Sequence, residues 1–215
     1  METTLTVTAA ESVGPDTVAL TFQSPETFDA QPGQFVKLSA TVDGEGYARF
    51  YTLSSPNVTD TFEVTVGVSE DGGPFSRHLA QLEPGDELEV DGPYGSDHYE
   101  GEARVVVLAG GPGVGPAVGI AERALDDGNE AAVVYRYDGD APAHEARLDA
   151  LREQGADVTV VGPDGDLTDA VADALTGDDG EQTFVYGFAP FVDEALEAVR
   201  EAGGADETAK VENFG

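Results

Sequence analysis

"RVVVLAGGPGVGPAVGIAERAL", residues 104–125, decides the fold because it joins an apolar strand to a helix through a glycine-rich turn. Its first half is short, apolar and rich in valine, as a strand buried inside a sheet is. Glycines follow, and Pro116 stands near the first turn of the expected helix. A strand that turns directly into a helix is the unit from which helix-covered parallel sheets are built.

The two sides of this stretch follow different patterns. Downstream, strands alternate with helices to about residue 203, which predicts right-handed βαβ units. Upstream, residues 4–95 contain one strand-like segment after another, a pattern that predicts a small antiparallel barrel or sandwich with one helix near residues 75–81. We therefore expect an antiparallel β-barrel over residues 1–99 and an α/β parallel-sheet domain over residues 100–215.

The charge of the chain restricts its partners. It has 43 acidic and 10 basic residues, a formal net charge of −33, and the acidic residues are distributed along the whole length. Nucleic acid is excluded as a partner by this charge. Because 40% of the residues are hydrophobic, the chain folds and its acidity is a property of the surface. Such a surface is typical of proteins adapted to molar salt, so we expect a halophilic source.

The residue types that are absent restrict the chemistry. The chain has no cysteine, which excludes disulfides and thiolate-held metal or iron–sulfur centres. No apolar run approaches the roughly 20 residues that span a bilayer, and the first residues lack the features of a signal peptide. We expect a soluble, cytoplasmic protein. The three histidines lack metal-ligand spacing and are expected to be surface polar residues, so no metal site is predicted.

Two segments could each receive a phosphate. The glycine-rich turn at 110–116 would let a backbone approach an anion closely, although a tight turn without a ligand explains the same residues. The start of the short helix, with Gly72, Gly73 and Ser76, offers a second site of this kind, although simple helix capping explains it equally well. Arg49 in "RFYTLSSP", residues 49–56, could hold the same diphosphate as this helix start.

Five segments together resemble the ferredoxin-NADP reductase family of flavin oxidoreductases. "RFYTLSSP" is similar to that family's flavin motif, "GGPFSRHL" (72–79) to its Gly-x-x-Ser-x-x-Leu segment, and "DGPYG" (91–95) to its Gly-Pro-x-Gly. "AGGPGVGP" (109–116) resembles its nicotinamide-nucleotide loop, and "VYGFAP" (185–190) its last-strand motif. The five occur in the order that the family has. The family often has Cys-Gly where this chain has Phe188 and Ala189, which puts the approach of the nicotinamide to the flavin in doubt.

The resemblance implies which residues bind the cofactors. Arg49 would pair with the FAD diphosphate, Tyr51 would pack against the isoalloxazine ring, and Thr52 would hydrogen-bond near flavin N5. The C-terminal "VENFG" (211–215), unless it is a frayed terminus, would bring Glu212 and Phe214 to the flavin. The residues implied as catalytic are Tyr51, Thr52 and Glu212, and those implied as cofactor-binding are Arg49, Phe50, Tyr51, Thr52, Gly72, Gly73, Ser76, Gly111, Gly113, Val114, Gly115, Pro116, Arg136, Asp138, Gly187, Phe188 and Phe214.

The function that the resemblance implies is electron transfer from NADH or NADPH, through FAD, to an acceptor protein such as ferredoxin. The alternatives are a non-catalytic regulatory subunit with the same fold and an electron-transfer subunit of a larger complex. Arg136 could receive the 2′-phosphate of NADPH, whereas Asp138 and Asp140 would repel it. Two carboxylates against one guanidinium favour NADH.

Overall fold

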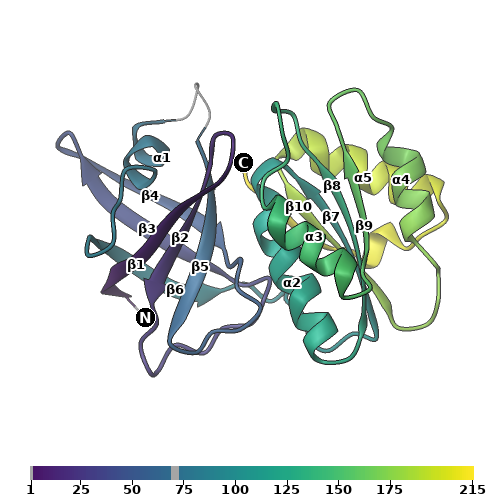
Figure 1. Cartoon of the computed structure of the whole chain (residues 1–215), viewed down its shortest axis with the longest axis horizontal. Helices are drawn as coiled ribbons and strands as arrows, with labels where there is room; N and C mark the ends of the chain where they lie inside the picture. The colour runs from purple at the N-terminus through teal and green to yellow at the C-terminus, as the bar shows by residue number, and fades with distance from the viewer. Residues whose placement is uncertain (1, 69–72) are drawn as a thin grey trace.

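The computed structural model describes residues 2–68 and 73–215 of the chain. They form two sheets of different kinds, which lie side by side with the C-terminus between them (Figure 1). The strands change from one sheet to the other between Tyr94 and Arg104. The predicted boundary at residues 99 and 100 falls in this segment and stays a prediction.

The first sheet is antiparallel and has the strand order β4-β3-β6-β1-β2-β5. Its edge strands meet where Leu53 bridges Val64 and where the Ser54 amide donates to the Glu63 carbonyl over 2.8 Å. This contact closes the sheet into a barrel, the first of the two predicted forms. The elements are β1 (Glu2–Gly14), β2 (Thr17–Gln23), β3 (Phe35–Val42), β4 (Glu45–Thr52), β5 (Thr61–Gly67), α1 (Pro74–Leu79) and β6 (Glu87–Tyr94).

The barrel encloses an apolar core because its strands alternate inward and outward residues. Phe22 and Phe62 stack with ring centroids 5.4 Å apart inside it, and Phe28 packs against Phe62. Phe75 and Leu79 are the buried residues of α1, so this short helix covers one end of the barrel (Figure 1). The side of α1 opposite Phe75 and Leu79 faces away from the barrel core.

The second sheet is parallel throughout, with the order β11-β10-β7-β8-β9. Helices α2 and α3 pack on one face, and α4 and α5 on the other. The elements are β7 (Arg104–Gly110), η1 (Gly111–Gly113), α2 (Val114–Asp126), β8 (Glu130–Arg136), α3 (Glu145–Glu153), β9 (Asp157–Val161), α4 (Leu167–Ala174), β10 (Glu181–Gly187), α5 (Ala189–Glu201), η2 (Asp206–Thr208) and β11 (Lys210–Asn213).

This architecture confirms the expected fold class, a β-barrel followed by an α/β domain. The C-terminal segment is not frayed, because β11 pairs in parallel with β10, Tyr186 opposite Glu212. Lys210 holds the start of β11 against the interdomain segment: its Nζ donates to the His98 carbonyl over 2.6 Å and lies 2.7 Å from Glu102.

The two domains meet through α2 and the end of the barrel. A Cβ placed on Gly115 would lie 2.3 Å from Thr65 Oγ1, and one on Gly119 would lie 2.7 Å from the Ser54 carbonyl oxygen. Only glycine permits this approach, so helix α2 rests directly on the barrel backbone. Arg147 of α3 adds contacts to Glu63 at 2.9 Å and to the Ser54 carbonyl at 2.7 Å.

His144 is buried in this interface, so the expectation that it lies on the surface is wrong. It is 4% exposed, its Nε2 lies 2.8 Å from Thr65 Oγ1, and its amide donates to the Val13 carbonyl over 2.7 Å. Burial lowers the pKa of His144 to about 3, and the Arg147 charge adds to this effect, so the ring is neutral at ordinary pH. A neutral ring suits a site in which its partner is the uncharged Thr65 hydroxyl.

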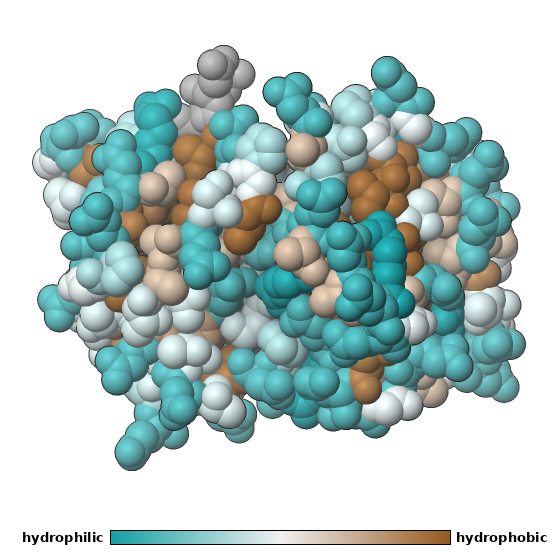
Figure 2. Space-filling model, viewed as in Figure 1, coloured by the Kyte–Doolittle hydropathy of each residue, from teal (hydrophilic) through white to brown (hydrophobic). Residues whose placement is uncertain are grey.

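Hydrophilic side chains cover most of the face shown in Figure 2, consistent with the acidic composition. Within residues 2–68 and 73–215, no helix is long and apolar enough to cross a membrane. The same residues include no group of three or more His, Asp or Glu side chains that could hold a metal ion.

Candidate functional site

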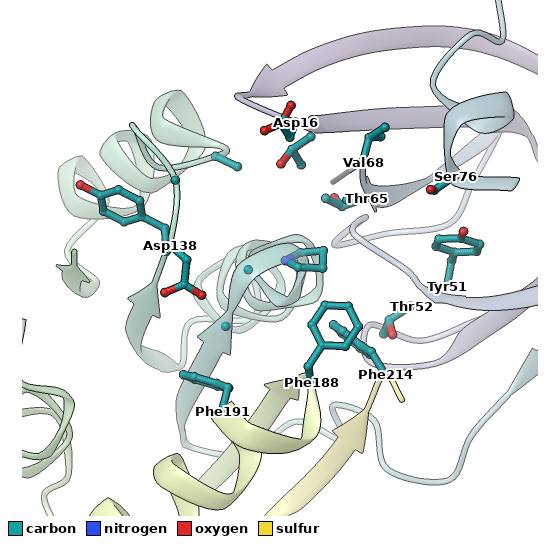
Figure 3. A pocket seen from close by; sticks show the side chains of 18 of the residues that line it. Asp16, Tyr51, Thr52, Thr65, Val68, Ser76, Asp138, Phe188, Phe191 and Phe214 are labelled. Atoms are coloured by element: carbon teal, nitrogen blue, oxygen red, sulfur yellow. The ribbon is translucent and has the colours of Figure 1, made fainter. Parts of the chain in front are cut away.

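A cavity of about 840 Å³ lies between the two domains, large enough for an extended organic ligand. In Figure 3, Tyr51, Thr52 and Ser76 face it from the barrel, and Asp138 and Phe188 from the α/β domain. The predicted site residues that line it are Arg49, Phe50, Tyr51, Thr52, Gly73, Ser76, Gly111, Pro116, Arg136, Asp138, Phe188 and Phe214. Gly72 lies outside the described residues.

Strand β4 supplies the barrel side of the cavity. Arg49 and Tyr51 are two residues apart, so both side chains leave the strand on one face. Arg49 is exposed, and the only hydrogen bond of its side chain within the described part of the chain goes to the adjacent Ala48 carbonyl, over 2.8 Å. No carboxylate of residues 3–68 or 73–215 pairs with it. In a chain of net charge −33, an arginine that lines a cavity and pairs with no carboxylate of the described residues can bind an anionic ligand.

Aromatic packing fixes the floor next to Arg49. The rings of Tyr47 and Phe75 stack with centroids 6.2 Å apart, and Tyr51 lies 6.5 Å from Phe75. Burial raises the pKa of Tyr51 to about 12, against a smaller opposing effect of the Arg49 charge. Tyr51 therefore remains a neutral phenol, and its ring offers an apolar surface to a planar ligand.

The start of α1 opens onto the same cavity. Gly73 precedes the helix, and a Cβ placed on it would meet no atom within 4 Å, so space remains beside this backbone. The Ser76 hydroxyl donates to the Gly73 carbonyl over 3.1 Å and lines the cavity. These groups lie on the side of α1 that faces away from the barrel core.

Glu212 reaches the barrel from the C-terminal strand. The Thr52 hydroxyl donates to Glu212 Oε2 over 2.7 Å, joining the two domains at the wall of the cavity. Burial raises the pKa of Glu212 to about 7, and the hydrogen bond from Thr52 opposes the shift only in part. Glu212 also lines a second cavity of about 170 Å³, whose rim includes the exposed residues Ser96 and Asp97. The carboxyl group thus lies between the main cavity and the surface.

The glycine-rich turn divides into two parts. Gly111 and Pro116 line the cavity, but Gly113, Val114 and Gly115 do not. A Cβ on Gly113 would lie 2.2 Å from the Tyr186 carbonyl oxygen, and Gly115 packs on Thr65. These glycines are required by packing, and their predicted contacts with a nucleotide stay predictions.

Phenylalanines close the cavity beneath the turn. Phe188 is 50% exposed, and its ring meets that of Phe214 edge to face, with centroids 5.9 Å apart (Figure 3). The Phe214 amide donates to the Gly187 carbonyl over 2.9 Å, which fixes the tail beside the last strand. Gly187 itself is covered, because a Cβ there would lie 2.6 Å from the Phe191 ring.

Arg136 and Asp138 line the α/β side of the cavity, where strand β8 ends. Arg136 already has protein partners: its Nη1 lies 3.4 Å from Glu194 Oε1, and its Nη2 donates to the Pro163 carbonyl over 3.0 Å. Asp138 is exposed. The structure therefore brings the two predicted residues together, but only the carboxylate is turned toward the cavity without a protein partner among residues 2–68 and 73–215.

Sequence reasoning missed several lining residues. They come from strands, helices and loops of both domains, and no glycine cluster marks them in the sequence. Alternation along β4 could have indicated Tyr47, which lies two residues before Arg49 on the same strand. The missed lining residues include Asp16, Tyr47, Thr65, Val68, Phe75, Tyr135, Tyr137 and Phe191.

Comparisons with known proteins agree with this geometry. Residues 4–99 match the family model described as the oxidoreductase FAD-binding domain. NADH-cytochrome b5 reductase 1 of Laccaria bicolor is 35% identical over 121 residues, which are 54% of this chain and 39% of that protein. A glycine betaine monooxygenase reductase subunit of Chromohalobacter salexigens is 41% identical over 96 residues, which are 43% of this chain and 26% of that protein. The chain thus spans well under half the length of these two relatives.

A solved structure extends the likeness to both domains. The flavohem-like FAD/NAD binding domain of nitric oxide dioxygenase from Vibrio cholerae superposes with a TM-score of 0.85. It is 18% identical, and the match covers 99% of this chain and 98% of that one. At this identity the match establishes the shared two-domain fold.

Proposed function

We propose that the chain is an FAD-dependent reductase that takes electrons from NADH or NADPH and passes them to an acceptor protein, because residues 4–99 match the model of the oxidoreductase FAD-binding domain. The barrel would hold FAD, and the α/β domain would hold the nicotinamide nucleotide. The two relatives are both named as reductases, one of them a subunit of an oxygenase system.

The observation that carries this proposal is Arg49. It is exposed in a cavity of about 840 Å³, and no carboxylate of the described residues pairs with it. A guanidinium presents a planar set of donors that suits a diphosphate. The open backbone at Gly73 and the Ser76 hydroxyl line the same cavity and would hold the other side of that group.

The other residues of the cavity fit the rest of an FAD molecule. Tyr51, neutral because burial raises its pKa to about 12, would pack against the isoalloxazine ring. Phe214, held edge to face against Phe188, would cover the ring from the side of the α/β domain. When bound, the flavin supplies the chemistry that converts a two-electron donor into single electrons, and the protein positions it.

Glu212 and Thr52 would transfer a proton between solvent and this site. With a pKa of about 7, the carboxyl group is present in both protonation states near neutral pH. Thr52 lines the main cavity and donates to Glu212, which lines the small cavity with the exposed Asp97. We propose that Glu212 exchanges protons with solvent on that side and that Thr52 orients them at the cavity.

The acceptor is proposed to be a protein, because the barrel carries an exposed aromatic cluster at the cavity rim. Phe50 is 60% exposed and Tyr94 is 38% exposed, and both rings meet Phe35 at centroid distances of 5.4 and 6.0 Å. Phe50 also lines the cavity. Exposed apolar patches of this kind mark protein–protein contacts, and this one would bring an acceptor close to the flavin. A ferredoxin is one acceptor that would fit.

We also propose that the protein works in concentrated salt, in a halophilic cytoplasm. The support is the formal charge of −33 on 215 residues together with a folded apolar core. At about 1 M salt the Debye length falls to roughly 3 Å, which removes most of the repulsion between surface carboxylates.

The proposed function is tested with protein purified and assayed in high salt. Bound FAD should be released on denaturation. NADH should drive reduction of two one-electron acceptors, ferricyanide and cytochrome c. Protein that binds FAD but turns over neither acceptor with either nucleotide would contradict the enzymatic proposal and favour a regulatory subunit. Protein that binds no FAD would contradict the proposal entirely.

A further inference from the structure

The side chain of Arg136 contacts protein oxygens, although a nucleotide site could use the same cation to bind a phosphate. Arg136 ends β8 at the cavity, where a cation could meet a phosphate. Its two terminal nitrogens instead point to protein oxygens, Nη1 to Glu194 of α5 at 3.4 Å and Nη2 to the Pro163 carbonyl at 3.0 Å. The Arg136 side chain is 17% exposed and lines the cavity, whereas that of Glu194 is 53% exposed and does not line it.

The carboxylates near Arg136 disfavour a phosphate at this side of the cavity. Asp138, two residues after Arg136, lines the cavity and is exposed. The Glu194 carboxylate offsets part of the Arg136 charge, and Asp138 adds a second negative charge at the cavity. A phosphate monoester carries about −1.5 to −2 charges at pH 7 and would be repelled, whereas the free hydroxyls of a ribose could donate to a carboxylate.

We propose that Glu194 is a specificity-determining residue of this site: by holding Arg136, it excludes a ribose 2′-phosphate and selects NADH over NADPH. This inference rests on the proposed function and goes beyond it, because it identifies the nucleotide and the residue that selects it. Glu194 acts through Arg136 and is a positioning residue.

The substitution Glu194→Gln tests the inference, because it removes the charge that holds Arg136 and keeps the size of the side chain. The FAD-loaded variant, assayed in high salt, should show a KM for NADPH about two- to fivefold lower than the unmodified protein, with kcat for NADPH unchanged. Glu197→Gln is the matched control, because Glu197 is exposed on the same helix and should leave the NADPH to NADH ratio unchanged.

A binding measurement separates this inference from the proposed function. Calorimetric titration of the FAD-loaded protein with 2′,5′-ADP and with 5′-ADP requires no turnover. Glu194→Gln should tighten 2′,5′-ADP about two- to fivefold relative to 5′-ADP. An unchanged ratio in this variant, or an unmodified protein that binds 2′,5′-ADP more tightly, would overturn the inference even if NADH reduces the flavin. Failure of both nucleotides to bind would contradict the proposed function instead.

Discussion

The Thr52 hydroxyl donates a 2.7 Å hydrogen bond to the Glu212 carboxylate, across 160 residues of sequence and across the boundary between the two sheets. Three features produce this contact. β11 pairs with β10, Lys210 ties the start of β11 to the interdomain segment, and Thr52 stands at the end of β4. The C-terminus of the chain thereby becomes a wall of the candidate flavin site.

Replacement of Glu212 by Gln should change how stability depends on pH. The pKa of Glu212 is raised from 4.5 to about 7 in the folded protein, so its ionised form is less favourable there than in the unfolded chain. This cost is absent below about pH 4.5, grows as the pH rises, and is complete above about pH 7. The unmodified protein should therefore lose stability relative to Glu212→Gln over this window.

Urea unfolding at constant high salt, at pH values from about 4.5 to about 8, measures this difference. Comparing the two proteins cancels the contribution of the other carboxylates. A stability difference that does not vary with pH would show that Glu212 titrates at its ordinary value and would remove the support for a proton-exchanging role.

Arg49→Ala should weaken FAD binding because it removes the cation proposed to hold the diphosphate. A charge-assisted hydrogen bond contributes on the order of 1.5 to 3 kcal/mol, so the Kd for FAD should rise by roughly tenfold to a hundredfold. Fluorescence quenching of FAD added to the apoprotein measures the Kd. Arg152→Ala is the control, since Arg152 is an exposed arginine of α3 that pairs with Asp149 and does not line the cavity. Equal affinities for the two variants would exclude Arg49 as the diphosphate ligand.

Gly115→Ala should destabilise the contact between the domains. Its Cβ would lie 2.3 Å from Thr65 Oγ1 and 2.5 Å from Ser54 Oγ, so α2 must move away from the barrel. Overpacking of this kind costs about 1 to 3 kcal/mol, and the melting temperature should fall by several degrees. Gly46→Ala is the control, because a Cβ there would meet no atom within 4 Å. If both variants melt like the unmodified protein, the close packing of α2 on the barrel is not a stabilising contact.

The melting temperature should rise steeply with salt. The formal charge of −33 disfavours the compact state at low ionic strength, and screening removes this repulsion as the salt concentration rises from about 0.1 M to about 1 M. Scanning calorimetry over a series of KCl concentrations measures the effect. A melting temperature that is flat or falls with salt would contradict the proposed adaptation to concentrated salt.

The fold was predictable because its signals are local. Period-two alternation marks the barrel strands, and the apolar run from Val105 to Ala109 marks a central strand of the parallel sheet. Much of the candidate site was predictable from the residues that resemble a known family, and Arg49, Tyr51 and Ser76 do line one cavity. What they bind there stays a prediction.

Other features depend on contacts between distant segments and leave no local signal. His144 looks like a surface residue because its burial depends on Thr65, which belongs to the other domain. The pair of Arg136 and Glu194 joins β8 to α5 across 58 residues, so counting charges near Arg136 alone could not reveal it. Gly115 resembles a phosphate-binding glycine in sequence, but in the fold it permits contact between the domains.

The most direct test of the account is the visible spectrum of the protein, purified in high salt and loaded with FAD, before and after anaerobic addition of NADH. The account predicts flavin absorption bands that remain through desalting and that bleach within the mixing time of a stoichiometric addition. Spectra with no flavin bands, or bands that neither NADH nor NADPH bleaches, would contradict the central claim that this cavity unites FAD with a nicotinamide nucleotide.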